Sequence, residues 1–204
     1  MTDLPPLYIL RHGETAWNVE GRFQGQLDSP LTQTGIAQAE AQNAILRECL
    51  PPDVGAVSST AGRARATAEI ALRGLELDAT PRFDDRLLEI DFGAWQGLTR
   101  VEIEAGWPDI MAAADEDLWQ FYAPGGERLD QMVARVEAVL RDLAGPTVLI
   151  THGVTSRVIR CVALGFPPDR LADLPGGQGI VHRVRGGRAD ILAPTGVPID
   201  TTRL

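Results

Sequence analysis

Two histidines in this sequence each follow a short apolar run. Residues 7–10 lead directly into Arg11 and His12, and residues 148–150 lead through one threonine into His152. Runs of this length are typical of buried strands, and open α/β sheets bind their ligands at the carboxyl ends of parallel strands. We therefore expect both histidines, together with Arg11, at one edge of a sheet.

A second arginine, Arg63, follows a third apolar run, residues 54–57, at the start of a predicted helix. Because guanidinium groups fork onto phosphate oxygens, Arg11 and Arg63 predict a site for a phosphoryl group. A neutral imidazole can attack phosphorus, and nearby arginines lower the pKa of an imidazole, which keeps it neutral at about pH 7. The arrangement predicts His12 as a nucleophile that forms a phosphohistidine and so divides one difficult step into two.

The leaving alcohol requires a proton, and Glu89 is the carboxyl group that the sequence offers for this role. Its neighbours Leu88 and Ile90 are apolar. Partial burial raises the pKa of a carboxyl group, as a general acid requires. We therefore expect Glu89 to protonate the leaving group.

Composition narrows the chemistry further. The 204 residues carry a formal net charge of −9, and all 19 basic residues are arginine. A P-loop and a Schiff base each need a lysine, so both classes of site are excluded. The acidic balance argues against a nucleic-acid surface, and no run approaches the roughly 20 apolar residues of a membrane span. We expect no nucleic-acid partner and no membrane association.

The cysteines and histidines indicate where the protein is located in the cell and whether it binds a metal ion. Cys49 and Cys161 form no C-x-x-C pair, and isolated thiols are typical of cytosolic proteins. Residues 1–6 show no secretory signal, so we expect a cytoplasmic protein. The three histidines lack the close spacing of metal ligands, which predicts no metal site. The sequence does not specify an oligomeric state, so a homo-oligomer stays open.

Strand-like and helix-like stretches alternate along the chain. Alternation of this kind is typical of a largely parallel sheet with helices on both faces, an α/β fold. Thr99 and Glu102 match a capping box, which predicts a helix start. The expected strands or extended segments are residues 7–10, 54–57, 81–89, 148–150, 179–184 and 189–192, and the other expected helices are 33–49, 62–72, 127–144 and 154–164.

Further motifs surround the residues named so far. The set comprises Arg11-His12-Gly13-Glu14-Thr15, Trp17-Asn18, Gln24-Gly25, Leu31-Thr32, Ser58-Ser59, Arg63-Ala64, Glu89-Ile90-Asp91-Phe92-Gly93, Pro124-Gly125-Gly126-Glu127 and Thr151-His152-Gly153. In this order, over residues 7–185, the set resembles the histidine phosphatase superfamily, also called the phosphoglycerate mutase-like family. The resemblance implies a three-layer αβα sandwich with a mostly parallel central sheet. It also implies one domain, 1–204, with a short lid insertion at about 90–130, and no cofactor.

The resemblance also implies a role for each matching residue. His12 would be the phosphorylated nucleophile and Glu89 the general acid and base. Arg11, Arg63 and His152 would take part in catalysis by holding the phosphoryl group. The implied substrate-binding residues are Arg11, Asn18, Gln24, Gly25, Arg63, His152 and Gly153.

The choice of acceptor separates the branches of this family. The stretch from Glu89 to Gly93 and the short lid resemble the phosphatase branch, which includes broad-specificity and α-ribazole phosphatases and gives the phosphoryl group to water. We therefore expect a phosphatase of small phosphorylated metabolites. A cofactor-dependent phosphoglycerate mutase is the alternative, since mutases return the group to a sugar acid. An inactive phosphate-binding protein and a metallo-hydrolase also stay open.

Several residues outside these motifs are expected to be structural. His182 lies in a predicted hairpin strand, and Arg65 is expected to face solvent. Aromatic residues of the expected lid are assigned to the core, with one or two contacting substrate: Trp95, Trp107, Trp119, Phe121 and Tyr122.

Overall fold

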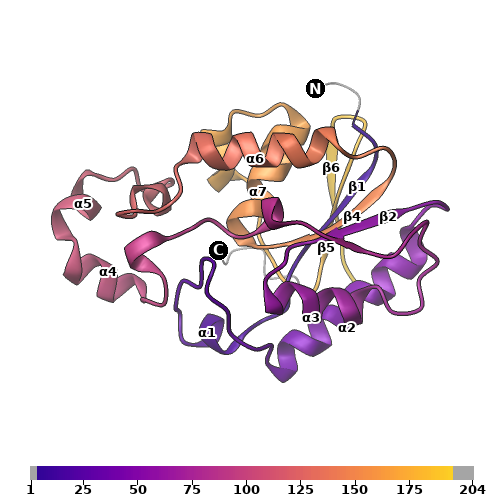
Figure 1. Cartoon of the computed structure of the whole chain (residues 1–204), viewed down its shortest axis with the longest axis horizontal. Coiled ribbons are helices and arrows are strands. Elements are labelled where there is room, and N and C mark those ends of the chain that lie inside the picture. Colours follow the sequence, from indigo (N-terminus) through magenta and orange to yellow (C-terminus); the bar gives the residue numbers. More distant parts are fainter. Residues whose placement is uncertain (1–3, 195–204) are drawn as a thin grey trace.

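A six-stranded sheet forms the centre of the chain in the computed structural model, which describes residues 4–194 (Figure 1). The strand order is β3-β2-β4-β1-β5-β6. The strands are β1 (Leu7–Arg11), β2 (Gly55–Ser58), β3 (Arg82–Phe83), β4 (Thr147–Thr151), β5 (Val181–Arg185) and β6 (Arg188–Leu192). Strands β1 to β4 are parallel, whereas β5 is antiparallel to β1 and β6 to β5. The predicted, mostly parallel α/β sheet is confirmed.

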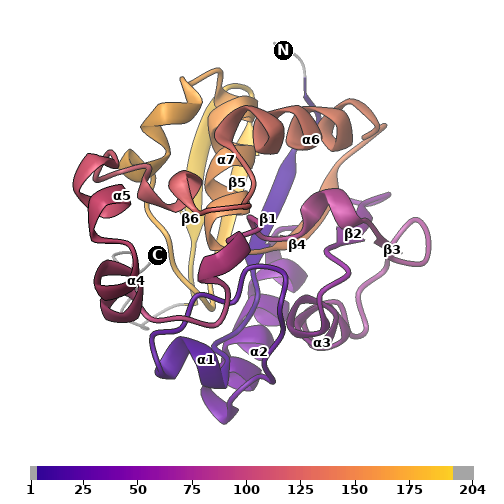
Figure 2. The same ribbon diagram turned by 60° about the vertical axis from the view of Figure 1, so that its left-hand side comes forward.

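Helices cover both faces of this sheet. They are α2 (Gln33–Cys49) and α3 (Gly62–Ala71) on one face and α6 (Leu129–Arg141) and α7 (Gly153–Leu164) on the other (Figures 1 and 2). In β1, Leu7 and Ile9 pack into the core beneath α6 and α7, whereas Tyr8 and Leu10 pack beneath α2 and α3. Because successive strand residues point to opposite faces, an unbroken apolar run needs cover on both sides, which the two helix pairs provide.

The register of two neighbouring strands brings the histidines together. Arg11 lies opposite Thr151 in the parallel pair of β1 and β4, and the His12 N–H donates to the Thr151 carbonyl over 3.0 Å. His12 and His152 therefore leave the sheet side by side, as expected for residues at the carboxyl ends of parallel strands.

Short elements lie beyond this end of the sheet. They are α1 (Ala16–Val19), α4 (Arg100–Gly106), α5 (Pro108–Ala113) and 3₁₀ helices at Asp85–Leu87, Gly93–Trp95 and Trp119–Tyr122; another 3₁₀ turn, Pro168–Asp173, follows α7. We call residues 93–126 the cap segment. The Gly97 N–H donates to the Phe23 carbonyl and the Phe23 N–H to the Leu98 carbonyl, which ties the cap segment to the loop after α1.

Two predicted boundaries differ from the structure. The segment 81–89 is a strand only at Arg82–Phe83, because the Asp84 carboxylate accepts the Arg86 N–H and starts a 3₁₀ turn. The helix predicted over 127–144 is shorter and begins at Leu129. Glu127 instead forms an ion pair with Arg135, with nitrogen–oxygen distances of 2.6 and 2.8 Å, and so remains outside the helix.

Other sequence predictions concern helix starts and thiols. The capping box at Thr99 is present and starts α4. Cys49 and Cys161 are both free thiols, and Cys161 is buried against the α6–α7 core. Within residues 4–194, none of the helices combines the length and the apolarity that crossing a bilayer requires.

Candidate active site

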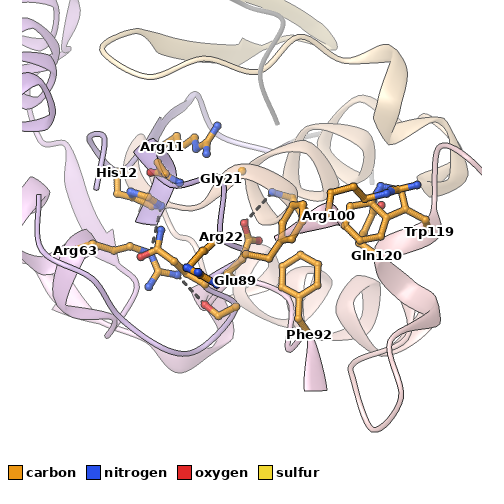
Figure 3. A pocket seen from close by; sticks show the side chains of 16 residues that line it. Arg11, His12, Gly21, Arg22, Arg63, Glu89, Phe92, Arg100, Trp119 and Gln120 are labelled. Carbon is orange, nitrogen blue, oxygen red and sulfur yellow. Dashed lines mark hydrogen bonds between the residues drawn. The ribbon is translucent and has the colours of Figure 1, made fainter. Parts of the chain in front are cut away.

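A cavity of about 430 Å³ opens at the carboxyl end of β1 (Figure 3). Four of the residues singled out for phosphoryl chemistry line it, namely Arg11, His12, Arg63 and Glu89. The other lining residues are Asn18, Gly21, Arg22, Phe23, Gln24, Gly25, Phe92, Arg100, Trp119, Gln120, Gly153 and Val154. The cavity therefore joins the sheet edge, the loop after α1 and the cap segment.

His12 is held as a neutral imidazole with one nitrogen turned toward Arg63. Its Nδ1 lies 2.8 Å from the Gly13 carbonyl oxygen, so Nδ1 carries the proton and donates it there. The other nitrogen, Nε2, accepts from Arg63 Nε over 3.2 Å. Burial, and then the charges of Arg63 and Arg11, hold the pKa of His12 well below 6.5. Nε2 thus keeps the lone pair that a nucleophile needs.

Arg63 fixes the loop that forms one wall of the cavity. Its Nη2 donates to the Gly25 carbonyl over 2.7 Å. Its Nη1 donates to the Leu27 carbonyl and to Asp28 Oδ1, over 2.6 and 3.0 Å. The side chain is almost fully buried, so these bonds hold a cation beside His12 Nε2.

Asp28 supports Arg63, although the sequence did not single it out. Besides its bond to the Arg63 guanidinium, its Oδ1 accepts the Arg63 backbone N–H over 3.1 Å, at the start of α3. The N-cap residue Ala61 supplies no side-chain bond of its own, so Asp28 stabilises this helix start from a distant loop. Asp28 lies between two of the sequence motifs, Gln24-Gly25 and Leu31-Thr32, and belongs to neither.

The Arg63 arrangement predicts the effect of two substitutions. Arg63→Lys should lower kcat/KM for a phosphomonoester by about 10²-fold, because a lysine lacks the forked guanidinium whose bonds to His12, Asp28 and Gly25 fix the cation in the cavity. Arg63→Ala should lower it further, since no cation then remains beside His12. Steady-state kinetics will measure both. Arg65→Lys is the matched control, because Arg65 is exposed and stacks on Phe83 with its guanidinium carbon 4.0 Å from the ring centroid. Full activity in Arg63→Lys would show that the fork is unimportant.

Glu89 lies at the amino end of α7, and its two oxygens differ in their partners. Oε1 accepts the N–H groups of Ile90 and Thr155, and it lies 3.0 Å from the Thr155 hydroxyl, whose one hydrogen is shared with the Leu88 carbonyl at 2.8 Å. Oε2 accepts one hydrogen bond, from the Val154 N–H over 3.1 Å. The oxygen with the spare lone pair is therefore Oε2, and it is the atom that can carry or accept a proton in the cavity.

Two charged groups lie beside Gly153 at the start of α7. A β-carbon at this position would be at ordinary contact distance from both, 3.5 Å from Arg11 Cζ and 3.6 Å from Glu89 Oε2. Arg11 is nearly buried, and the negative charge of Glu89 offsets part of the lowering of its pKa that burial causes. Arg11, Glu89 and Gly153 thus form the wall opposite Arg63.

His152 is brought close to His12 but does not line the cavity. The two ring centroids are 5.2 Å apart, and the rings meet at 62°. His152 Nε2 lies 2.8 Å from Ser59 Oγ, while Nδ1 is buried and has no hydrogen-bond partner within residues 4–194. Burial, followed by the charge of Arg63, holds the pKa of His152 well below 6.5.

The remaining predicted binding residues form the loop side of the cavity. Asn18 Oδ1 accepts the Thr15 N–H, which directs the amide NH₂ of Asn18 away from this bond. Gln24 Nε2 donates to Thr15 Oγ1 over 2.8 Å, and Gly25 provides the carbonyl for Arg63. Gln178, which sequence reasoning missed, donates to the His12 carbonyl over 3.0 Å from the loop before β5. That loop carries no motif, so no sequence signal pointed to it.

The aromatic residues divide into core and cavity groups. Of the five that the sequence singled out, Trp119 lines the cavity. Trp95 is fully buried, whereas Phe121 and Tyr122 line a separate groove against α6. Phe23 and Phe92 also line the cavity, although the sequence did not single them out as substrate contacts. Their role depends on how the loop after α1 meets the cap segment, which local patterns do not show.

Three buried histidines predict acid sensitivity. Burial lowers the pKa of His12 and His152 well below 6.5 and that of His182, beside Arg160 on α7, to about 3. The unfolded chain binds these protons as pH falls through 6.5, but the folded chain does not, so stability is present above pH 6.5 and is lost below it. Urea titrations should show the free energy of unfolding falling between about pH 7 and 5, by at most ~1.4 kcal/mol per histidine per pH unit.

A variant separates His182 from the other titrating groups. His182→Gln should fold and should show a shallower fall in stability over the same pH range, because one of the three shifted histidines is gone. His182 lies outside the cavity, so activity serves as an internal check. A slope as steep as that of the wild type would mean that His182 does not titrate in this way.

Comparison with known proteins establishes the family. Residues 7–190 match the histidine phosphatase superfamily (branch 1). The chain belongs to the histidine phosphatase superfamily. The family resemblance predicted from the motifs is therefore confirmed.

Relatives within the histidine phosphatase superfamily carry both mutase and phosphatase names. A probable phosphoglycerate mutase, GpmB, of Salmonella paratyphi C is 34% identical over 169 residues, which cover 79% of this chain and 75% of that protein. The solved structure of Bacillus stearothermophilus YhfR is 34% identical with a TM-score of 0.77, covering 95% of this chain and 98% of that one. A mycobacterial glucosyl-3-phosphoglycerate phosphatase bound to vanadate is 32% identical with a TM-score of 0.75, covering 93% and 98%.

Proposed function

We propose that this protein is a phosphomonoesterase of small phosphorylated metabolites that works through a phosphohistidine on His12. The observation that carries the proposal is the neutral His12 imidazole, with Nε2 3.2 Å from Arg63 Nε and with Arg11 and Glu89 in the same cavity wall. Cations for the phosphoryl oxygens, a nucleophile and a proton carrier are thus within one site, as phosphoryl transfer requires.

The reaction has two steps. In the first, His12 Nε2 attacks phosphorus, the bond from phosphorus to the ester oxygen breaks, and Glu89 Oε2 gives its proton to the leaving alcohol. In the second, water attacks the phosphohistidine and loses a proton to Glu89 Oε2, which releases phosphate and restores neutral His12. Arg11 and Arg63 balance the charge of the equatorial phosphoryl oxygens in both steps.

His152 can add one hydrogen bond to the phosphoryl group. Ser59 Oγ already accepts the Ala61 N–H over 3.3 Å, so its hydroxyl hydrogen is available to donate to His152 Nε2. Nδ1 then carries the ring proton of a neutral His152. His152 does not line the cavity, but its ring centroid lies 5.2 Å from that of His12, and this proximity supports a role as a donor to a phosphoryl group on His12.

A mutase is the second candidate, because the Salmonella relative bears that name. A substrate screen separates the two: hydrolysis of several phosphomonoesters to phosphate is expected of the phosphatase. Interconversion of 2- and 3-phosphoglycerate that needs 2,3-bisphosphoglycerate, with little phosphate release, would favour the mutase. Failure to act on any of these compounds would favour a phosphate-binding protein.

Activity should survive chelation. Within residues 4–194, no group of three or more His, Cys, Asp or Glu side chains is arranged to hold a metal ion, and the cations beside His12 are arginines. We expect phosphate release to be unchanged by EDTA followed by gel filtration. Loss of activity that zinc or magnesium restores would revive the metallo-hydrolase alternative.

A further inference from the structure

The end of the cavity at His12, which we call the phosphoryl end, is lined by arginines, whereas the other end is lined largely by aromatic side chains. Figure 3 shows Phe92, Trp119 and Gln120 on the side opposite Arg11 and His12. We call this end, made by Phe23, Phe92, Trp119, Gln120 and Val154, the alcohol subsite, because a phosphate ester bound at His12 directs its alcohol part there.

Three aromatic rings form the body of the alcohol subsite. The Phe23 ring centroid lies 4.9 Å from that of Trp119 and 5.4 Å from that of Phe92. Packing of this kind holds each ring in place, so the subsite is preformed rather than assembled on binding. A preformed aromatic wall favours a flat or apolar ligand group, since burying apolar area is favourable and few side chains lose freedom.

Two arginines border the subsite, and carboxylates already neutralise both. Arg22 contacts Glu20 and Glu102, with nitrogen–oxygen distances of 2.9 and 3.0 Å. Arg100 contacts Glu104 over 2.6 Å and lies over the Trp119 ring, 4.2 Å from its centroid. Two cations thus face three carboxylates, and the group is net negative. A carboxylate or second phosphate on the alcohol would find no unbalanced cation here.

We infer that the alcohol subsite selects phosphomonoesters of uncharged, largely apolar or aromatic alcohols over those whose alcohol carries a second anion. The inference rests on the proposed function, and it narrows the substrate class at the same site. It also separates this chain from a phosphoglycerate mutase, whose substrate carries a carboxylate beside the phosphorylated carbon chain.

Binding of phosphonates tests the subsite without any chemistry. Benzylphosphonate and phosphonoacetate share the phosphonate group but carry an aromatic ring and a carboxylate, respectively. By calorimetry we expect benzylphosphonate to bind at least about tenfold more tightly, in keeping with the worth of one buried apolar group. Equal binding, or tighter binding of phosphonoacetate, overturns the inference whether or not the protein is an enzyme.

Steady-state kinetics with two esters provide a second test of the alcohol subsite. Benzyl phosphate should exceed 3-phosphoglycerate in kcat/KM by at least about tenfold. Trp119→Leu should lose about tenfold with benzyl phosphate and much less with ethyl phosphate, which does not reach the ring. Trp107→Leu is the control, because Trp107 packs on Trp95 in the same cap segment but does not line the cavity. A Trp119→Leu loss that is equal for both esters overturns the inference.

A substitution that removes one carboxylate near the alcohol subsite should increase activity toward an anionic substrate. Glu104→Gln removes a carboxylate that lies outside the cavity and frees Arg100 from its pair. The kcat/KM for 3-phosphoglycerate should rise about threefold, while that for benzyl phosphate stays unchanged; no rise, or an equal rise for both, counts against the inference. Selective binding of benzylphosphonate without hydrolysis of any ester would instead overturn the proposed function and leave the inference standing.

Discussion

His12→Ala should lower kcat by about 10⁴-fold or more with every phosphomonoester, because the variant has no atom that can take up the phosphoryl group. Figure 3 shows the imidazole between Arg11 and Arg63, the two cations expected to hold the phosphoryl group. Initial rates of phosphate release, measured at enzyme concentrations high enough to detect slow turnover, will give the residual activity.

The control for His12→Ala must separate loss of chemistry from loss of fold. Removing the ring also removes the Nδ1–H bond to Gly13 and the bond from Arg63, so circular dichroism and urea unfolding should accompany the kinetics. His182→Gln is the matched control, since His182 is equally buried but lies outside the cavity. A folded His12→Ala protein with near wild-type turnover would mean that another group is the nucleophile.

Glu89→Gln has the second largest expected effect, and its size should depend on the leaving group. Alkyl phosphates leave as strongly basic alkoxides that need a proton, whereas p-nitrophenolate leaves largely unaided. General-acid assistance is typically worth about 10²–10⁴-fold. We expect a loss of that order in kcat/KM for an alkyl phosphate and a far smaller loss in the nitrophenolate burst, which reports the first step alone.

The Glu89→Gln experiment needs a control for the structural effect of replacing the carboxylate by an amide. Glu89 Oε2 accepts the Val154 N–H, and an amide NH₂ at that position would oppose another donor, at a cost of about 1–3 kcal/mol of stability. Asp91→Asn is a suitable control, because Asp91 is a half-buried carboxylate nearby that does not line the cavity. Equal losses with both leaving groups in the burst would exclude Glu89 as the leaving-group acid.

The sequence predicted those parts of the site that follow from local patterns. An unbroken apolar run ending in Arg11 and His12 is enough to predict β1 and its placement, because a strand buried on both faces needs no polar alternation. A second run of the same kind predicts β4 and places His152 at the same edge of the sheet. The direct pairing of β4 with β1, which brings His152 beside His12, was not predicted and is seen in the structure. Helices α2, α3, α6 and α7 likewise begin and end within a few residues of the predicted boundaries.

The parts that the sequence did not predict depend on contacts between distant loops. Asp28 holds Arg63 from 35 positions away, and Gln178 reaches His12 across 166 positions. Phe23 joins the alcohol subsite only because its loop pairs with the cap segment. Neither sequence periodicity nor capping motifs predict such contacts, because the contacts arise from the packing of irregular segments. The motifs located the phosphoryl end of the cavity, whereas its other end required the structure.

Trapping the phosphoenzyme tests directly whether His12 is the nucleophile. The protein is mixed with a radiolabelled phosphomonoester, quenched in denaturant within the burst, and digested for mass spectrometry. We expect one labelled peptide, with the phosphoryl group on His12, stable in alkali and released in acid; His12→Ala should yield no label. Burst-phase turnover without any labelled protein, or label on a residue other than His12, would contradict the account.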